Sequence, residues 1–296
     1  MFRKMMSITA LFIVVLMLAA CGANIQINPF TAEETVTQSF STSAPPHLVV
    51  EMFNGGVEVT TGNDNTVKID VVKRGGGVTQ ADAQNDLKNV EVTMAQNGGT
   101  IRVVARRTDQ PVDIGNSGAS AQLRVPNGAT LDLRSSNGGI TSSGSVSDVK
   151  AQTSNGSIVV RGPLGQINLN TSNGPITLDG GSGSVDVETS NGPINVTADN
   201  VVVTGRTSNG PLHFTGSLAQ GHSELSTSNG DVVVTLPANA QFAIDAETSN
   251  AKISSDFAVT SQDFSDNRLR GTVGSDPAVT LRLQTSNGPI TIHQGK

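Results

Sequence analysis

Apolar residues return to equivalent positions at a nearly constant interval along most of this chain. One burst of apolar residues begins at Ile140, Ile158, Ile176, Ile194, Leu212, Val232, Ile253 and Ile290. A second apolar residue usually follows two positions later, as Val160 follows Ile158, and a further pair such as Val149 and Ala151 completes each unit. A spacing of two places both side chains on one face of a β-strand. The pattern therefore predicts two short strands in every unit.

A tetrapeptide of the type Thr-Ser-Asn-Gly precedes the first burst of each unit. Its starting positions are separated by 18, 18, 18, 18, 20, 21 and 37 residues. The last interval is close to two units, so we expect another unit between 248 and 285, with Asp266 and Asn267 in place of its tetrapeptide. Asn and Gly tolerate left-handed backbone better than other residues, which predicts a sharp corner at each tetrapeptide. The asparagines of these corners are Asn137, Asn155, Asn173, Asn191, Asn209, Asn229, Asn250 and Asn287.

Units of this size cannot bury an apolar face alone and have to stack on their neighbours. The sequence therefore predicts an all-β fold, a parallel β-helix or solenoid of about 18-residue coils, which we expect to be right-handed. Stacking would place the corner asparagines one above another as a hydrogen-bonded ladder. A sugar-binding strip is the alternative reading. We favour the structural reading, because a binding site needs only a few such residues.

The regular repeat covers residues 135–296, and residues 33–134 form a less regular, β-rich N-terminal part of the same domain. Within it, Asn54-Gly55-Gly56 followed by Val57 echoes the later corners. A short helix is expected from Thr79 to Lys88, with Asp82 three residues after a Thr79 cap. We expect this part to cover one end of the solenoid and the stretch 256–277 to guard the other, because open sheet edges invite aggregation.

The chain begins with a three-part export signal. Arg3 and Lys4 precede an apolar run that is too short for a comfortable membrane span, and Leu18-Ala19-Ala20-Cys21 closes it. Residues 1–20 are thus interpreted as a lipoprotein signal peptide, Cys21 as the lipidated residue and residues 21–32 as a tether. An ordinary signal peptide or an uncleaved anchor is the alternative. Cys21 is the only cysteine, so it cannot form an internal disulfide.

Loss of the leader lowers Lys plus Arg from 19 to 17 against 25 Asp plus Glu, a net charge of about −8. This charge argues against a nucleic-acid partner, since Lys and Arg supply most affinity for phosphate. Acyl chains on Cys21 would therefore hold the protein at the membrane. We expect a membrane-anchored lipoprotein of the cell envelope, exposed outside the cytoplasm at the cell surface or outer membrane.

The serial Thr-Ser-Asn-Gly units, a Val-Pro at 125–126 and a Leu-Pro at 236–237 carry a family resemblance. Over about residues 35–294 the chain resembles the bacterial β-solenoid domains of unknown function described as putative adhesins. The resemblance implies a β-helical envelope protein that is often membrane-anchored, and some relatives are tied to envelope-stress signalling. It carries no catalytic or ligand residues over to this chain.

Residues that could carry catalysis are sparse. The four histidines, which lie apart in the sequence, show no metal-ligand spacing, so we expect no metal and no cofactor. A polysaccharide hydrolase or lyase would need clustered carboxylates. Asp132, Arg134 and Lys150 could become neighbours on adjacent coils, with Asp148 beside them. No Tyr or Trp is present to stack on a sugar ring. The other outward carboxylates considered are Asp179, Asp186 and Asp199.

Three functions remain open, and none follows from fold alone. The first is an adhesin or surface-binding module without catalysis, in contact with a glycan or an envelope protein. The second is an envelope-stress or structural protein that acts through protein partners. A polysaccharide-active enzyme is the third. We favour the first.

Overall fold

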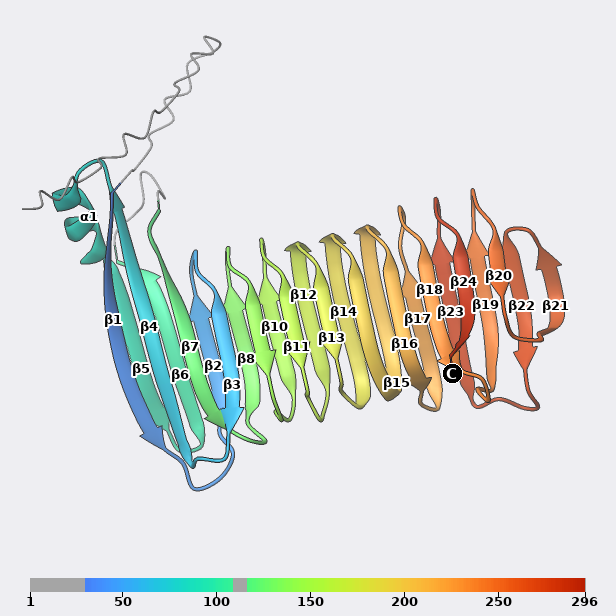
Figure 1. Cartoon of the computed structure of the whole chain (residues 1–296), viewed down its shortest axis with the longest axis horizontal. Helices are drawn as coiled ribbons and strands as arrows, with labels where there is room; N and C mark the ends of the chain where they lie inside the picture. The colour runs from blue at the N-terminus through green and yellow to red at the C-terminus, as the bar shows by residue number, and fades with distance from the viewer. Residues whose placement is uncertain (1–29, 109–115, 296) are drawn as a thin grey trace, which may run out of the picture.

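The computed structural model describes residues 30–108 and 116–295. The predicted signal peptide, Cys21 and most of the predicted tether lie outside these residues. The described chain forms one continuous 24-stranded sheet wound into a rod (Figure 1). The all-β solenoid expected from the sequence is confirmed. No helix among the described residues has the length and apolar character needed to cross a membrane.

Each coil contributes one strand to each of two opposed faces. Face one holds the strands that lead into the Asn-Gly corners: β8 (Thr130–Ser135), β10 (Val149–Thr153), β12 (Ile167–Asn173) and β14 (Gly183–Asn191). Face two holds the strands that follow the corners: β9 (Ile140–Ser143), β11 (Ile158–Arg161), β13 (Ile176–Asp179) and β16 (Leu212–Leu218). The long strand β15 (Ile194–Asn209) bends from face two into face one. Val149 pairs with Ile167 and Ile158 with Ile176, so equivalent positions of successive repeats lie side by side, as predicted.

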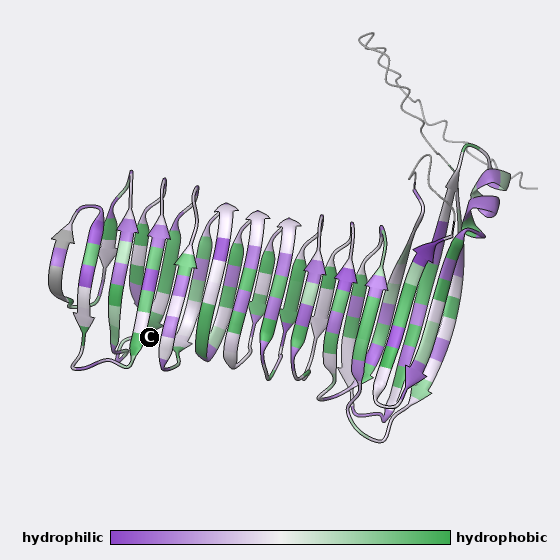
Figure 2. Cartoon of the chain, turned by 180° about the vertical axis from the view of Figure 1, so that it is seen from behind, coloured by the Kyte–Doolittle hydropathy of each residue, from purple (hydrophilic) through white to green (hydrophobic). Residues whose placement is uncertain are grey.

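The core is a thin stack of Val, Ile and Leu layers. Side chains alternate between buried and exposed along the strands, which Figure 2 shows as alternating colours. Ser142 and Gly205 are two of the inward positions that depart from this composition. Ser142 is fully buried, and among the described residues its hydroxyl has no hydrogen-bond partner. Gly205 also faces the core. A Cβ at this position would lie 2.9 Å from Cδ2 of Leu225, so glycine leaves room for the leucine side chain.

The first coil of the chain is inserted between two later ones. Strand β2 (His47–Met52) pairs with both β6 (Thr100–Arg107) and β8, and strand β3 (Val57–Gly62) pairs with both β7 (Gly118–Pro126) and β9. The chain therefore stacks out of sequence order at this end.

The last coil is inserted in the same way at the opposite end. Strand β23 (Val279–Thr285) lies between β17 (Gly221–Ser226) and β19 (Phe242–Thr248). Strand β24 (Ile290–Gly295) lies between β18 (Val232–Pro237) and β20 (Ile253–Ser255). Accordingly, the C terminus marked in Figure 1 lies inward from the tip of the rod.

The predicted extra coil between 248 and 285 is therefore wrong. Asp266 and Asn267 form the turn between β21 (Thr260–Ser265) and β22 (Arg268–Val273), an antiparallel hairpin. Strand β22 pairs antiparallel with β19, so this hairpin extends face one at the tip before the chain returns one layer inward. Residue spacing measures the length of chain between corners, whereas pairing decides which coil stacks on which.

Antiparallel strands and one helix close the N-terminal end. Strands β1 (Phe30–Ser41) and β4 (Thr66–Gly77) pair antiparallel, β4 pairs antiparallel with β7, and β5 (Val90–Asn97) forms a hairpin with β6. Helix α1 (Gln80–Leu87) has the expected capping box, formed by Thr79 and Asp82. A Cβ on Gly75 would lie 2.4 Å from the Leu87 nitrogen, so the helix packs directly on the backbone of β4.

One aromatic side chain covers the apolar core at the opposite end. Phe257, 6% exposed, packs edge-to-face on Phe242 with ring centroids 5.2 Å apart. Aromatic pairs favour this geometry, which stabilises the fold beyond the burial of the two rings.

Candidate functional site

The buried threonine of each corner ties neighbouring coils together. Its hydroxyl donates to a glycine carbonyl in the adjacent corner, as Thr171 does to Gly156 at 3.0 Å. Ser135 makes the same contact with Gly55 at 2.8 Å. Equivalent bonds of 2.9–3.1 Å come from Thr153, Thr189, Thr207, Thr227, Thr248 and Thr285. The row of threonines therefore points into the rod and is not available to a ligand.

The corner asparagines form one continuous chain of side-chain hydrogen bonds. Each Nδ2 donates to the Oδ1 of the neighbouring asparagine over 2.5–3.0 Å. The order follows the stacking, so Asn287 lies between Asn229 and Asn250. Asn54 adds a ninth member, and its own Nδ2 donates to the Ser117 carbonyl. The Asn54-Gly55-Gly56 echo was the sequence signal for this member.

The reason for glycine in the corners differs from the one expected. Among the ladder asparagines and their following glycines, only Asn54 has a positive φ, of 48°. A Cβ on Gly174 would instead lie 2.2 Å from the Gly156 carbonyl oxygen, and Gly192 meets Gly174 at the same distance. Glycine is thus required because the corner backbones approach closely. The expectation of left-handed corners is wrong.

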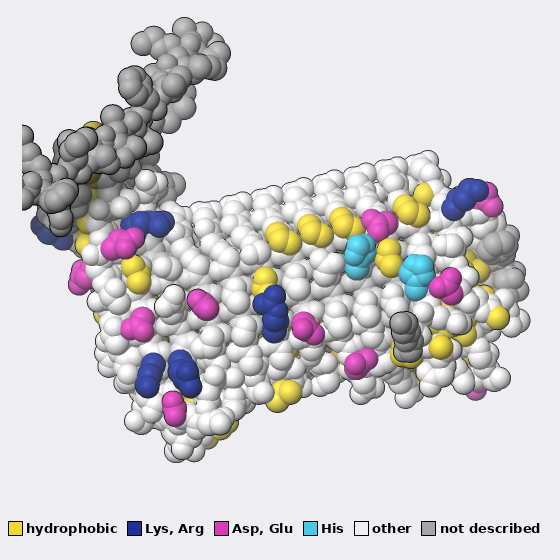
Figure 3. All heavy atoms as spheres, viewed as in Figure 1, with side chains coloured by type: hydrophobic (Ala, Val, Ile, Leu, Met, Phe, Trp, Pro, Cys, Tyr) yellow, Lys and Arg dark blue, Asp and Glu magenta, His cyan; other side chains and the backbone are white. Residues whose placement is uncertain are grey.

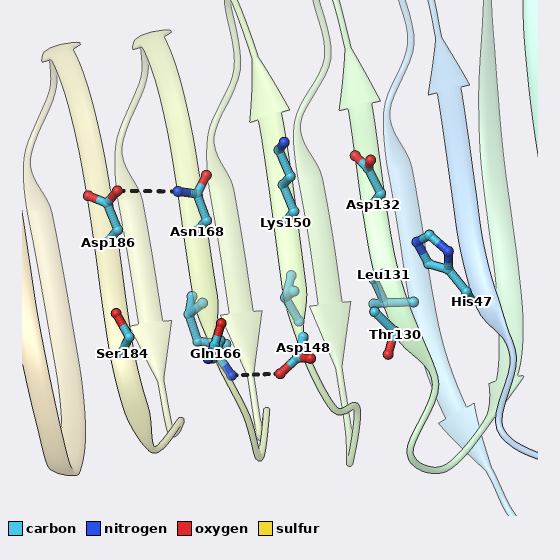
Figure 4. A pocket seen from close by; sticks show the side chains of 12 residues that line it. His47, Thr130, Leu131, Asp132, Asp148, Lys150, Gln166, Asn168, Ser184 and Asp186 are labelled. Atoms are coloured by element: carbon cyan, nitrogen blue, oxygen red, sulfur yellow. Dashed lines mark hydrogen bonds between the residues drawn. The ribbon is translucent and has the colours of Figure 1, made fainter.

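A shallow groove of about 360 Å³ runs across the coils on the outer surface of face one. Figure 4 shows its two rows of side chains: Asp132, Lys150, Asn168 and Asp186 in one, and Thr130, Asp148, Gln166 and Ser184 in the other. His47 from the inserted β2 stands at one end. Both rows have outward side chains from successive parallel strands, which repeat about every 4.8 Å.

The carboxylates of the groove differ in their surroundings. Asp148 accepts the Gln166 backbone N–H at 2.8 Å, and Asp186 accepts the side-chain amide of Asn168 at 3.2 Å. Oδ2 of Asp132 accepts from Arg134 at 3.1 Å, whereas its Oδ1 is buried without a partner among the described residues. The Lys150 ammonium makes no hydrogen bond or ion pair with any residue that the structure describes. The groove therefore offers one free cation between acceptors.

The structure brings together most of the residues considered from sequence. Lys150 lies directly opposite Asp132, and Arg134 lies in the neighbouring outward row, where it reaches Glu51 at 3.8 Å. Asp179 lies on β13 of face two, and Asp199 accepts from Ser217 within the bend of β15. Sequence reasoning missed five polar lining residues: His47, Thr130, Gln166, Asn168 and Ser184. The repeat spacing could have found the last four, but His47 could not be placed without the inserted coil.

Face two presents mainly small polar side chains. Figure 3 shows scattered charges across its middle and two histidines, each beside an acidic side chain. His213 lies 3.0 Å from Asp231, and His293 lies 3.0 Å from Asp256. Hydrogen bonds from His293 and the Gln294 backbone hold the pKa of Asp256 below its ordinary value. The described residues contain no cluster of three or more side chains suited to a metal ion.

Three solved structures align with most of this chain. A putative adhesin from Bacteroides fragilis NCTC 9343 aligns with 88% of this chain and 97% of its own, with 9% identity and a TM-score of 0.45. A putative adhesin from Parabacteroides distasonis ATCC 8503 aligns over the same shares of the two chains, with 11% identity and a TM-score of 0.35. A putative cell adhesion protein from Clostridium sporogenes ATCC 15579 aligns with 89% of this chain and 100% of its own, with 10% identity and a TM-score of 0.25.

A search of curated proteins finds no significant match. A family model matches residues 47–293, from the start of β2 into β24. The matched region contains the first inserted coil, most of the last one and the whole asparagine ladder. The chain belongs to the Toastrack DUF4097 family.

Proposed function

We propose that this protein is a lipid-anchored binding module of the cell envelope, tethered through Cys21, that holds a polyhydroxylated polymer along the groove of face one without chemical turnover. The observation that carries the proposal is the pair of polar rows repeated at the coil spacing. A polymer with hydroxyl groups at regular intervals can meet the same donors and acceptors on consecutive coils. The free ammonium of Lys150 and the carboxylates beside it provide charge-assisted hydrogen bonds.

The groove suits retention better than turnover. Asp132 is engaged by Arg134, and Asp148 is engaged by a backbone N–H. Glycosidic hydrolysis needs one carboxyl to protonate the leaving group and a second to act on the opposite side of the sugar. The groove is open along the surface, and no enclosing loop of the described chain appears among its lining residues. These features favour a glycan bound along the surface.

A glycan array with the full protein in detergent micelles tests the binding site. We expect saturable binding that falls about tenfold when Lys150→Ala and Asp186→Ala are combined, because each removes charge-assisted hydrogen bonds. Asp179→Ala, on face two, is the matched control and should bind normally. Equal losses in both variants, or an array without signal, would count against the groove. Recovery of a single membrane protein without any glycan would favour action through protein partners.

The anchor has its own test. Cys21→Ser should move the protein from the membrane fraction to the soluble fraction and abolish labelling with radioactive palmitate, because no acyl chain can then be attached. Glycan binding by the released protein should be unchanged. Retention in the membrane fraction would show that something other than lipid on Cys21 anchors the chain.

A further inference from the structure

Most asparagines of the ladder precede a glycine, and the Asn-Gly step is chemically fragile. In an Asn-Gly step, the glycine nitrogen can attack the side-chain amide carbon, since no Cβ hinders the approach. The N–Cγ bond forms, ammonia leaves, and water then opens the five-membered succinimide to aspartate or isoaspartate. This chain has ten Asn-Gly steps, all within the described residues.

Nine of these ten asparagines have a hydrogen-bonded side-chain amide. Eight belong to the ladder, and Asn127 donates to Asn63 at 2.8 Å. The attacking nitrogen is also held in several steps. Gly174 and Gly192 donate their N–H groups to carbonyls of the adjacent coil at 3.1 and 3.0 Å, and Gly128 donates to Ser145 at 2.7 Å. Succinimide formation at these steps first requires the corner to open.

Asn97 is the exception. It ends β5 at the two-residue turn that leads into β6, and it is exposed. Among the described residues, neither its side-chain amide nor the Gly98 N–H has a hydrogen-bond partner. Gly98 has a φ of +58°, and a Cβ added there would meet nothing within 4 Å. The amide carbon and the attacking nitrogen at this step are therefore both unrestrained.

We propose that Asn97 is a spontaneous modification site, and that the ladder suppresses the same reaction at the other Asn-Gly steps. The product matters locally, because isoaspartate adds a methylene to the backbone of a tight turn. The neighbouring Gly99 carbonyl accepts the backbone N–H of His47 at 2.9 Å. A lengthened turn would thus disturb the residue that stands at one end of the groove.

Hydroxylamine, which cleaves at succinimides formed at Asn-Gly, distinguishes the steps directly. We expect the native full-length protein, in detergent, to be cut at 97–98 alone, and the urea-unfolded protein to be cut at all ten steps. Peptide mapping after incubation in mildly alkaline buffer should show Asn97 converting about tenfold or more faster than any ladder asparagine, because opening a corner breaks at least two hydrogen bonds. Equal rates in the native state, or a stable Asn97, would overturn the proposal.

Two variants separate the ladder from simple burial. Asn97→Ser should abolish native cleavage and leave the fold unchanged. Asn173→Ala removes one partner from each of Asn155 and Asn191, so those two steps should become reactive while Asn229 stays protected. Unchanged protection of Asn155 and Asn191 in a folded variant would contradict the role of the ladder. Far-ultraviolet circular dichroism checks that the variant is folded.

Discussion

The middle of the rod and its two ends are built from the same coil in different ways. From β10 to β16 each coil stacks on the coil that directly precedes it in the sequence, so its contacts are local. At the ends, the coils 47–62 and 279–295 are inserted between coils that other parts of the chain supply. Asn137 bonds Asn54 across 83 residues, and Asn287 bonds Asn229 across 58.

The difference teaches how a repeat protein can gain cooperativity. In a simple solenoid each repeat contacts only its neighbours, and the ends can unravel independently. Here neither terminal coil of the chain can leave without opening a gap between two others. The end strands therefore bind distant segments together, at the expense of slower closure of long loops.

Removal of one coil from the end or one coil of the same size from the middle should show the largest difference between the two regions. Ending the chain at Ala278 and deleting 156–173 each remove four buried apolar side chains, worth about 1.5–3 kcal/mol apiece. The middle deletion rejoins Asn155 to Gly174 in register and should leave a folded, less stable protein. Loss of the last coil should abolish soluble folded protein, because β17 and β18 then face a gap.

Chemical denaturation and size-exclusion chromatography measure both variants. A truncated chain that stays monomeric and as stable as the middle deletion would show that insertion of the last coil is not required.

Acid should affect the N-terminal end before the middle. Burial alone would raise the pKa of Asp86, but hydrogen bonds from the Arg107 guanidinium, the Ser117 hydroxyl and a backbone N–H hold it below its ordinary 3.8. A lowered folded-state pKa contributes stability that is complete above the unfolded value and is lost as the pH falls through the folded value. The Thr and Asn bonds of the middle do not titrate.

Asp86→Asn should cost about 3 kcal/mol, because the mostly buried Arg107 loses its ion pair. It should also remove the part of the stability loss that appears below pH 3.8. Hydrogen exchange at α1 and β6, followed against pH, is the measurement. Asp82→Asn, at the exposed cap of α1, changes the charge equally and serves as the control. If it alters the pH dependence of stability as much as Asp86→Asn does, the acid sensitivity does not come from Asp86.

A smaller effect is expected where α1 meets the sheet. Gly75→Ala places a Cβ 2.4 Å from the Leu87 nitrogen, so the helix must move, at about 1–3 kcal/mol. Gly99→Ala is the control, since nothing lies within 4 Å of its Cβ position, and it should stay within about 0.5 kcal/mol. Thermal unfolding would compare them. A Gly75→Ala variant as stable as Gly99→Ala would show that the helix packs loosely.

The smallest expected change tests the junction between the inserted first coil and the middle. Ser142 pairs with Val59 on one side and Val160 on the other, and its buried hydroxyl has no partner among the described residues. Ser142→Ala should therefore stabilise the fold by about 1 kcal/mol. Thr171→Val leaves the Gly156 carbonyl without its hydrogen bond from the threonine and should instead destabilise the fold by about 1–3 kcal/mol. Losses in both variants would point to an unseen partner of Ser142.

Much of the local structure could be predicted because its causes lie within a few residues. The alternation of apolar and polar residues predicted the strands, the constant repeat spacing predicted the coil, and Thr79 with Asp82 predicted the start of the helix. The groove was only partly predictable. Asp132 and Lys150 meet because they occupy equivalent positions in successive repeats, whereas His47 reaches them from a coil placed by pairing at a distance.

By itself, the sequence determined the unit: two strands, a corner and a row of stacked asparagines. The strands follow from side-chain alternation, which is local, whereas the reason for glycine in the corners is the close approach of neighbouring coils, which only the stacked structure shows. Only the tertiary structure decided the order in which the units stack. Nearly every corner has the same residues, so each could pair with almost any other. The connections and end strands, acting over tens of residues, select one arrangement.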